Sequence, residues 1–333
     1  MAKKVTQLSF ADVKGAIDCS GDIDCSNKGL TSLEGCPEKV KGTFNCSGNK
    51  LTSLAGAPKK IKGDFTCSSN KLTTLEGGPE EVKGDYDCSN NHLATLGGCP
   101  VFIMGDFSCS GNKLTSLKAE FVSSVGTTLT GGPELVEGDF NCSRNRLTDL
   151  EGSPKIVGGD LDCSFNQLTT LNNSPEVIFG DFSCSGNQLL SLEGAPRQVF
   201  GNFDCSGNQL TSLKGSPKKV KGNFICSCNH LTSLKGSPEE VDTFECSNNM
   251  LTSLKRSPEK VKGNFDCSMN QLTSLKGAPK KVKGTFNCSG NQLATLECEL
   301  KKVGGDFICE ENAQPFTEEE IRVAKNIKGN VLA

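Results

Sequence analysis

Cysteine recurs along this chain at a fixed interval, and that interval limits the folds the chain can adopt. Fourteen cysteines follow one another at a spacing of 21 residues that is interrupted twice, at positions 25, 46, 67, 88, 109, 142, 163, 184, 205, 226, 246, 267, 288 and 309. A period of this length is typical of repeat architectures, in which each unit buries its apolar edge against its neighbours. The 333 residues therefore predict one stack of about fourteen coils instead of two or three globular domains.

Within each repeat, the residues before the cysteine alternate between apolar and polar. In one example, Val40, Gly42, Phe44 and Cys46 share one parity and polar residues separate them. This period of two is typical of a β-strand with one buried face. The rest of the repeat, residues 47–58, contains an Asn, two Leu, two Gly and a Pro, and is too short and too rich in breakers for a helix. One coil should therefore be a strand, an Asn turn, a tight return and a Pro corner.

Two further columns support this register. The position of Phe44 holds Phe in eleven repeats, with Ile23, Tyr86 and Leu161 as substitutes, and we expect a continuous apolar spine there. The position of Asn49 holds Asn in thirteen repeats. A buried side-chain amide at that place can hydrogen-bond the turn backbone of its own coil and of a neighbouring coil.

At this point the chain resembles a known family. The motif F-x-C-S-x-N-x-L is similar to the leucine-rich-repeat signature L-x-x-L-x-L-x-x-N-x-L, with Phe and Cys in two Leu positions and with Val40 one residue upstream of the pattern. The repeated motif CSGNQLTSLxGxPxxVxGxF, followed after the last repeat by FTEEEI, resembles the repeats of proteins encoded by large tailed bacteriophages, over residues from about 13 to 333. The resemblance implies a mainly β, leucine-rich-repeat solenoid of about 14 coils with one parallel sheet.

The two ends are expected to form caps. Residues 1–20 should form the N-terminal cap, in which Val13–Cys19 repeats the strand motif, and residues 21–309 should form the solenoid. Residues 310–333 should form a C-terminal cap with a short helix at about 318–327, because Thr317 and Glu320 have the spacing of a capping box. The segment 118–130 lacks part of a coil and should bulge outward, and the coil of Phe244 lacks one residue and should kink.

Most of the cysteines fit a role in the core. Fourteen of the nineteen occupy the inward column, where they should act as reduced, small apolar residues. No pair has the C-x-x-C spacing of a zinc site. His92 and His230, the two histidines of the sequence, lie six coils apart, and no G-x-x-x-x-G-K-[ST] motif occurs. We therefore expect no metal, no cofactor and no enzyme activity.

Charge and hydropathy limit the classes of partner. The net charge of -3 makes nucleic acid an unlikely partner on bulk electrostatics. The first residues lack the apolar segment of a signal peptide, and no long apolar run follows. We expect no membrane association and a cytoplasmic location, which would be the host bacterial cytoplasm for a phage protein; a location in the virion is the alternative.

One candidate surface is acidic. The positions directly before and after the Phe column hold 14 acids among 28 residues and no Lys or Arg. The functional interpretation is a negative platform for a basic partner, and its candidate residues are Asp64, Asp85, Asp87, Asp106, Asp139, Asp160, Asp162 and Asp181. The alternative is a solvated face that prevents aggregation, and cation binding is a third interpretation.

A second candidate surface is apolar. The residues two and four positions after the corner Pro should point outward, and in the terminal coils they are Lys or Glu. In coils four to eight they become apolar, and such strips are typical of interfaces. The candidate partner-binding residues are these apolar residues together with Phe165, which lies nearby beyond the strand: Phe102, Met104, Leu135, Ile156, Phe165, Val177, Phe179 and Phe200. The alternative is that the segment 118–130 folds back and covers the strip.

These features favour a non-enzymatic scaffold or adaptor that binds a host or virion protein. A structural component of the virion and an inhibitor of a host enzyme or defence system are the alternatives. Self-association through the apolar strip is also open. The fold supplies the geometry of binding but does not identify a partner.

Overall fold

The computed structural model describes residues 7–118, 120–122, 128–130, 132–324 and 326–333. These residues form two compact units. The first runs to Gln167 and includes Asn173–Pro175, and the second consists of Leu168–Asn172 and Glu176–Ala333.

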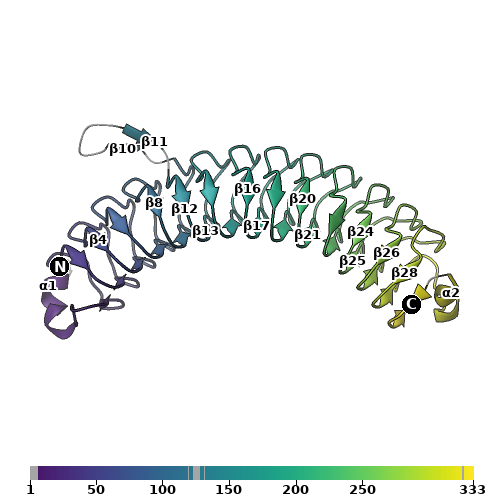
Figure 1. Ribbon diagram of the computed structural model, residues 1–333, viewed down its shortest axis with the longest axis horizontal. Helices are drawn as coiled ribbons and strands as arrows, with labels where there is room; N and C mark the ends of the chain where they lie inside the picture. Colours follow the sequence, from purple (N-terminus) through teal and green to yellow (C-terminus); the bar gives the residue numbers. More distant parts are fainter. Residues whose placement is uncertain (1–6, 119, 123–127, 131, 325) are drawn as a thin grey trace, which may run out of the picture. The chain divides into compact units, whose positions relative to one another are not determined.

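The main strands of the first unit carry the Phe column and pair in parallel (Figure 1). Equivalent residues of successive coils lie side by side, so that Phe44 pairs with Phe65 and Phe107 with Phe140. The expected stack of in-register coils is confirmed in this unit. Its main strands are β1 (Ile23–Asp24), β3 (Phe44–Asn45), β5 (Phe65–Thr66), β7 (Tyr86–Asp87), β9 (Phe107–Ser108), β13 (Phe140–Asn141) and β15 (Leu161–Asp162).

The second unit repeats this arrangement in the same register. Phe203 pairs with both Phe182 and Phe224, and the ladder continues to the last strand, where Phe307 pairs with Val331. Its main strands are β17 (Phe182–Ser183), β19 (Phe203–Asp204), β21 (Phe224–Ile225), β23 (Phe244–Glu245), β25 (Phe265–Asp266), β27 (Phe286–Asn287), β29 (Phe307–Ile308) and β31 (Val331–Leu332).

The alternating stretch of each coil forms two short strands, although its pattern predicts one. In most coils the segment between the two strands contains a glycine, as Gly105 does between β8 (Phe102–Ile103) and β9; in the coil of Phe244 the two strands are joined by Asp242 and Thr243. A Cβ atom at Gly105 would collide with the carboxylate of Asp85 in the preceding coil, so the side chain of Asp85 needs the space that glycine leaves. Because the chain bends at this glycine, the Val position lies in a second set of parallel sheets and not in the main sheet.

The second set of strands forms small sheets within each unit. In the first unit these are β2 (Lys39–Val40), β4 (Lys60–Ile61) and β6 (Glu81–Val82), and separately β8, β12 (Leu135–Val136) and β14 (Ile156–Val157). In the second unit they are β16 (Val177–Ile178), β18 (Gln198–Val199) and β20 (Lys219–Val220), and separately β22 (Glu240–Val241), β24 (Lys260–Val261), β26 (Lys281–Val282), β28 (Lys302–Val303) and β30 (Asn326–Ile327).

The core of each coil contains the side chains that the repeat predicts. In the coil of Phe65, the side chains of Ile61, Phe65, Cys67, Leu72 and Leu75 are all buried. The aromatic rings stack from coil to coil, with centroids 5.4 Å apart for Phe107 and Phe140. Removing these side chains from water supplies the main stabilisation of a repeat that cannot bury its apolar edge alone.

The N-terminal segment differs from the sequence-based prediction. Val13–Cys19 does not repeat the strand motif, because α1 (Phe10–Val13) and the 3₁₀ turn η1 (Lys14–Ala16) occupy its first half. Ser9 and Asp12 form a capping box that starts α1. The helix buries Phe10 with its ring centroid 6.5 Å from that of Phe44, which closes the apolar spine with an aromatic ring where a strand was expected.

At the other end, α2 (Glu318–Ala324) confirms the predicted helix but ends three residues earlier than expected. The capping box is present, because Thr317 N donates to Glu320 Oε2 at 2.8 Å and Glu320 N donates to Thr317 Oγ1 at 3.3 Å. The chain then returns as β30, which pairs with β28 in the small sheet that starts at β22, and as β31, which pairs with β29 in the main sheet.

The two irregular places behave differently. Within 118–130, β10 (Glu120–Val122) pairs antiparallel with β11 (Thr128–Thr130), and this hairpin lies apart from the neighbouring strands β8 and β12 (Figure 1). Residues 119, 123–127 and 131 lie outside the described residues. The alternative that the segment 118–130 covers the apolar strip depends on them and therefore stays a prediction. In the coil that lacks one residue, the small sheet ends at β20 and a new one starts at β22; the small sheets also break between β6 and β8, where no residue is lacking, so the kink stays a prediction.

Candidate functional site

The first acidic row has a structural use. Asp64 Oδ1 accepts a hydrogen bond from Asp85 N at 2.9 Å, and Asp85 Oδ1 accepts one from Asp106 N at 2.8 Å. The same bond joins Asp106 to Asp139 and Asp139 to Asp160, each time from the backbone N–H of the following coil. A short side chain with an acceptor oxygen at this position thus pairs a backbone donor that the main sheet leaves over, and the hydroxyls of Thr43 and Thr243 do the same in their coils.

The second acidic row stabilises the turn after each main strand. Asp87 Oδ1 accepts from Ser89 N and Asp162 Oδ1 from Ser164 N, both at 2.9 Å, which closes an Asx turn. In the first coil the same bond from Ser26 holds the pKa of Asp24 below its ordinary value. In the second unit, partial burial and the neighbouring Asp266 raise the pKa of Glu245.

These bonds account for both acidic rows without a partner. Asp85, Asp106 and Asp139 are nevertheless exposed, and among the ion pairs of the described residues none involves them. The hydrogen bonds along the first row join the chain from Asp64 to Asp160 in the first unit, and Asp181 bonds to Asn202 in the second. The negative platform therefore stays a prediction, with a structural role now attached to its residues.

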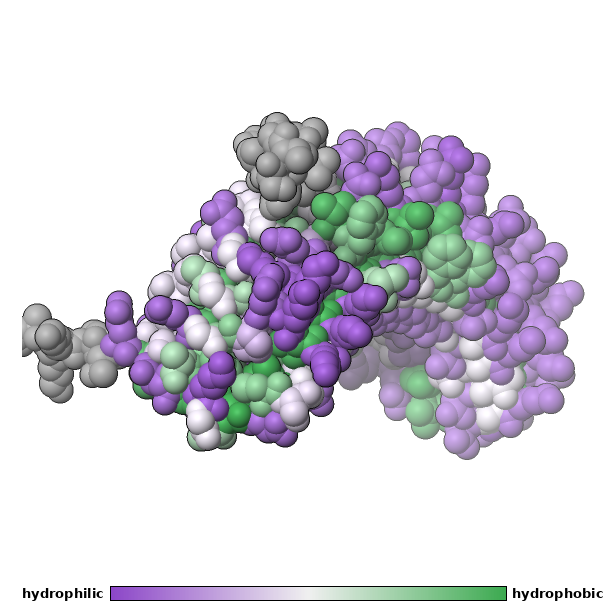
Figure 2. Space-filling view, turned by 60° about the vertical axis from the view of Figure 1, so that its left-hand side comes forward, coloured by the Kyte–Doolittle hydropathy of each residue, from purple (hydrophilic) through white to green (hydrophobic). Residues whose placement is uncertain are grey.

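In the first unit, the small sheet of β8, β12 and β14 presents an exposed apolar row. Leu135 pairs in register with both Phe102 and Ile156. Phe102 is 61% exposed and Ile156 54%, while Leu135 is half-buried. Met104, two residues after Phe102, is also exposed. The structure thus brings four of the expected residues together on one sheet face, and Figure 2 shows hydrophobic residues gathered at the surface beside hydrophilic ones.

In the second unit, the sheet of β16, β18 and β20 presents an aromatic pair. Phe179 and Phe200 stack with ring centroids 5.7 Å apart and 9° between the ring planes. Phe179 is 57% exposed, whereas Phe200 and Val177 are half-buried. The other face of the Phe200 ring is covered by Lys221, whose Nζ lies 4.2 Å from the ring centroid. We call Val177, Phe179, Gln198, Phe200, Lys219 and Lys221 the aromatic–lysine patch.

Phe165 does not lie in either row. It follows β15 in the Asn turn, nine residues after Ile156, and its backbone has a φ of 52°. Its ring is 54% exposed, and the Arg144 guanidinium lies 4.9 Å from the ring centroid. A bulky side chain in the left-handed region is strained, and such strain often occurs at functional positions. Phe165 is therefore a separate candidate contact.

The cysteines are thiols in the described structure and most lie in the core. Cys88 Sγ donates to the Ser108 carbonyl and Cys205 Sγ to the Ile225 carbonyl, both at 3.3 Å. Burial raises the pKa of the ladder thiols, to about 12 for Cys25 at the first coil and about 11 for Cys309 at the last. A protonated, buried thiol is a poor nucleophile and a poor metal ligand.

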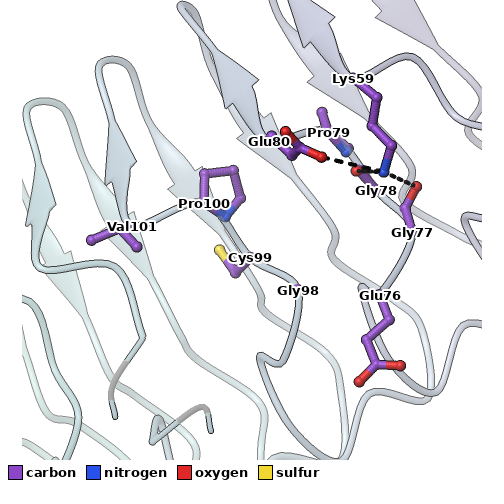
Figure 3. A pocket seen from close by; sticks show the side chains of 10 residues that line it. All are labelled: Lys59, Glu76, Gly77, Gly78, Pro79, Glu80, Gly98, Cys99, Pro100 and Val101. Atoms are coloured by element: carbon purple, nitrogen blue, oxygen red, sulfur yellow. Dashed lines mark hydrogen bonds and ion pairs between the residues drawn. The ribbon is translucent and has the colours of Figure 1, made fainter. Parts of the chain in front are cut away.

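A cavity of about 380 Å³ lies at two successive Pro corners of the first unit (Figure 3). Lys59 closes one side, because its Nζ donates to the carbonyls of Gly77 and Gly78 at 3.4 and 3.3 Å and lies 3.8 Å from Glu80 Oε1. Cys99 is on the other side, and burial raises the pKa of its thiol. The pattern of the repeat gave no signal for this cavity, whose lining includes Gly77 and Gly78.

Sequence reasoning also missed several exposed apolar side chains outside the two rows. In the second unit Leu190, Met250 and Met269 are exposed. Each replaces the polar residue or glycine that other coils carry at the same outward position. That departure from the repeat is the signal that could have found them.

Within the described residues, no group of three or more His, Cys, Asp or Glu side chains is placed to hold a metal ion. None of the helices in that part of the chain has the length and apolar character needed to cross a membrane.

Comparison with known proteins identifies the fold. No protein-family model matches the chain, and no curated protein is significantly similar to it. Its structure is similar to that of YopM, a leucine-rich effector protein from Yersinia pestis, with a TM-score of 0.60 and 20% identity over 93% of this chain and 88% of that chain. YopM from Yersinia enterocolitica WA-314 is less similar, with a TM-score of 0.33 and 19% identity over 93% of this chain and 91% of that chain. The APL1 leucine-rich-repeat domain has a TM-score of 0.47 and 17% identity over 80% of this chain and 81% of that chain. The chain thus has a leucine-rich-repeat solenoid fold, as its repeat implied.

Proposed function

We propose that this protein is a non-enzymatic scaffold that binds another protein through the exposed apolar residues of its small sheets. One observation carries the proposal. At outward positions where other coils have Lys or Glu, β8, β12 and β14 carry Phe102, Leu135 and Ile156, and the second unit carries Phe179 and Phe200. Exposed apolar side chains at consecutive in-register positions are typical of protein interfaces.

The fold supports the same function. YopM, which is similar in structure, is described as an effector protein, and leucine-rich repeats offer long regular surfaces for protein partners. We further propose that the partner is a host or virion protein and that binding takes place in the bacterial cytoplasm, because the repeat wording resembles that of phage-encoded proteins. No arrangement of side chains in the described residues favours catalysis.

The test is affinity capture with matched variants. Phe179→Lys combined with Phe200→Lys removes the aromatic pair, and Leu190→Lys combined with Met269→Lys makes the same kind of change at exposed sites of the same unit outside the patch. We expect the wild type and the Leu190/Met269 variant to retain the same protein from a host lysate, and the Phe179/Phe200 variant to lose it. Circular dichroism and the melting temperature should show that all three proteins are folded.

The same experiment distinguishes the rival outcomes. Equal capture by the Phe179/Phe200 variant would reject the second-unit site, and Met104→Lys with Ile156→Lys then tests the first-unit row in the same way. If the wild type self-associates with rising concentration and the Phe179/Phe200 or the Met104/Ile156 variant does not, the apolar surface joins copies of this chain. If the scaffold itself is found only in purified virus particles, it is a component of the virion.

A further inference from the structure

The second unit shows how its small sheets bind a carboxylate. Lys260 and Lys262 are two residues apart, on and just after β24, and both point outward. Glu240 of the preceding coil lies between them, with Oε2 3.4 Å from Lys260 Nζ and Oε1 2.9 Å from Lys262 Nζ. These two lysines lower the pKa of Glu240, which keeps it ionised. A Lys-x-Lys pair on this face is therefore a two-pronged clamp for one carboxylate.

The same pair occurs on β20 without an acid. Lys219 and Lys221 occupy the positions equivalent to Lys260 and Lys262, and both are exposed. No ion pair in the described part of the chain joins either lysine to a carboxylate, because Glu240 of the following coil turns to Lys260 and Lys262 instead. Lys219 and Lys221 thus repeat the Lys-x-Lys pair at equivalent positions, and neither is paired with a carboxylate in the described part of the chain.

Apolar surface adjoins this Lys-x-Lys pair on one side. Gln198 pairs in register with Lys219 and with Val177, so the rows Val177–Gln198–Lys219 and Phe179–Phe200–Lys221 run side by side over β16, β18 and β20. Lys221 already contacts the ring of Phe200. Exposed ion pairs contribute little to affinity by themselves, so a ligand held here needs the aromatic pair as its anchor and the two lysines for its orientation.

We propose that the aromatic–lysine patch binds an acidic segment of a partner protein, with a carboxylate side chain between Lys219 and Lys221 and an apolar side chain against Phe179 and Phe200. The inference rests on the proposed function and adds the chemistry of the partner to it. The occupant is a segment in which an Asp or Glu lies close to an apolar or aromatic residue. Val177 and Gln198 form the floor between the two contacts.

The geometry disfavours single-stranded nucleic acid, the other partner for which lysines beside aromatic rings are known. Proteins that bind single strands stack successive bases on free aromatic faces. Here Phe200 has Phe179 on one face and Lys221 on the other, and the two rings are 5.7 Å apart, too close to admit a base between them. One base at most could stack on this patch.

The test uses random-sequence peptides displayed on yeast and selected for binding to the full-length protein. Three proteins are compared in the binding step. They are the wild type, the charge-reversed Lys219→Glu/Lys221→Glu variant, and the matched control Lys281→Glu/Lys283→Glu, which reverses an equivalent Lys-x-Lys pair without aromatic neighbours. All four lysines are exposed, so both variants should fold and melt like the wild type.

We expect selected peptides to contain Asp or Glu within a few residues of an aromatic or large apolar residue. Lys219→Glu/Lys221→Glu should weaken peptide binding by about tenfold or more, and Lys281→Glu/Lys283→Glu should weaken it by much less. Added salt should weaken peptide binding by the wild type but not the residual binding by the Lys219→Glu/Lys221→Glu variant, because that variant has lost the attractive charges. The Phe179→Lys/Phe200→Lys variant should not bind them at all.

Each other outcome has one meaning. Apolar peptides that ignore the charge reversal but need Phe179 and Phe200 would overturn the acidic partner and leave the proposed function intact. Peptides that bind all variants equally, or no selected peptide, would overturn both. A fluorescent oligothymidylate that binds the wild type tightly and the charge-reversed variant weakly would overturn the inference in favour of nucleic acid.

Discussion

Asn208 Oδ1 accepts a hydrogen bond of 3.0 Å from the backbone N–H of Leu189 in the preceding coil. Its Nδ2 donates to the carbonyls of Cys184, Cys205 and Ser206 at 3.0, 3.1 and 3.2 Å. One buried amide therefore joins two coils at four backbone groups, three of them in buried hydrogen bonds, and the same bonds between coils recur at Asn70 and Asn270 in their own units.

The first prediction concerns this amide. Asn208→Ala leaves a buried N–H and buried carbonyls without partners, and should lower the free energy of unfolding by about 2–4 kcal/mol. Urea denaturation measures the change. The neighbouring Gln209 is exposed, so Gln209→Ala is the matched control and should alter stability by less than about 0.5 kcal/mol. Equal effects of the two variants would mean that the Asn column does not stabilise the stack.

Much of this network could be predicted because the repeat copies it. The period of Cys, the parity of Phe44 and Cys46 and the Asn column together identified the coil, its core and its turn, and the structure confirms them. Each prediction used many copies of one local pattern, so an error in one coil would have been visible in the others.

Features that occur once could not be predicted in this way. The strand motif at Val13–Cys19 suggested a strand within the N-terminal cap, but α1 forms there instead and places the ring of Phe10 against Phe44 at the end of the apolar spine. The bend between β8 and β9 depends on the space that Asp85 needs at Gly105, a contact between coils that a pattern along one coil does not contain. The candidate apolar residues were found by their departure from the repeat, but Phe165 proved to lie in a turn, apart from the sheet face.

The second prediction concerns pH. Burial raises the pKa of Cys205 well above its ordinary value of 9.0, so above pH 9 the unfolded chain loses this thiol proton while the folded chain keeps it. The unfolded state then binds fewer protons, and stability falls as pH rises, by about 1.4 kcal/mol per pH unit for each such cysteine. Below pH 8 the thiol is protonated in both states and contributes no pH dependence.

Cys205→Ala isolates that contribution. The variant should be less stable than the wild type at pH 7.5, because it leaves a small cavity. The difference should narrow by about 1.4 kcal/mol per unit above pH 9, since the variant has no thiol to ionise on unfolding. Urea midpoints at pH 7.5, 9 and 10 with a reductant present measure this. A difference that stays constant with pH would show that Cys205 ionises equally in the folded state.

The third prediction concerns the single tyrosine. Tyr86 replaces Phe in the spine, with its ring 5.0 Å from that of Phe65, and its buried hydroxyl has no hydrogen-bond partner in the described structure. Tyr86→Phe should therefore raise the free energy of unfolding by about 1 kcal/mol, the lower end of the cost of an unpaired buried polar group. Phe203→Tyr makes the reverse change in the second unit and should destabilise by a similar amount. If Tyr86→Phe destabilises instead, the hydroxyl binds a buried water that the tyrosine needs.

The fourth prediction separates the two contributions of Phe165, its strained backbone and its exposed ring. Five other coils carry Gly at this position, with φ of 64° at Gly186 and 63° at Gly207, and eight carry another non-Gly residue at positive φ, such as Met269 at 52°; Phe165 adopts 52° with a bulky aromatic side chain. Phe165→Gly and Phe165→Ala both remove the ring and its contact with Arg144, which is worth about 0.5–1 kcal/mol at an exposed site. They differ in the Cβ atom, which is unfavourable in the left-handed region by about 1 kcal/mol. We therefore expect the Gly variant to be more stable than the Ala variant by about that amount in urea denaturation.

The nearby exposed Gln167, which is not in the left-handed region, gives the control pair Gln167→Gly and Gln167→Ala, for which Gly should not be the more stable residue. If Ala equals or exceeds Gly at position 165, the turn there has no strain, and the argument for Phe165 as a functional contact loses its basis. If Gly is the more stable and also exceeds the wild type, the protein keeps a destabilising aromatic ring in an exposed turn, which is the behaviour expected of a residue retained for binding.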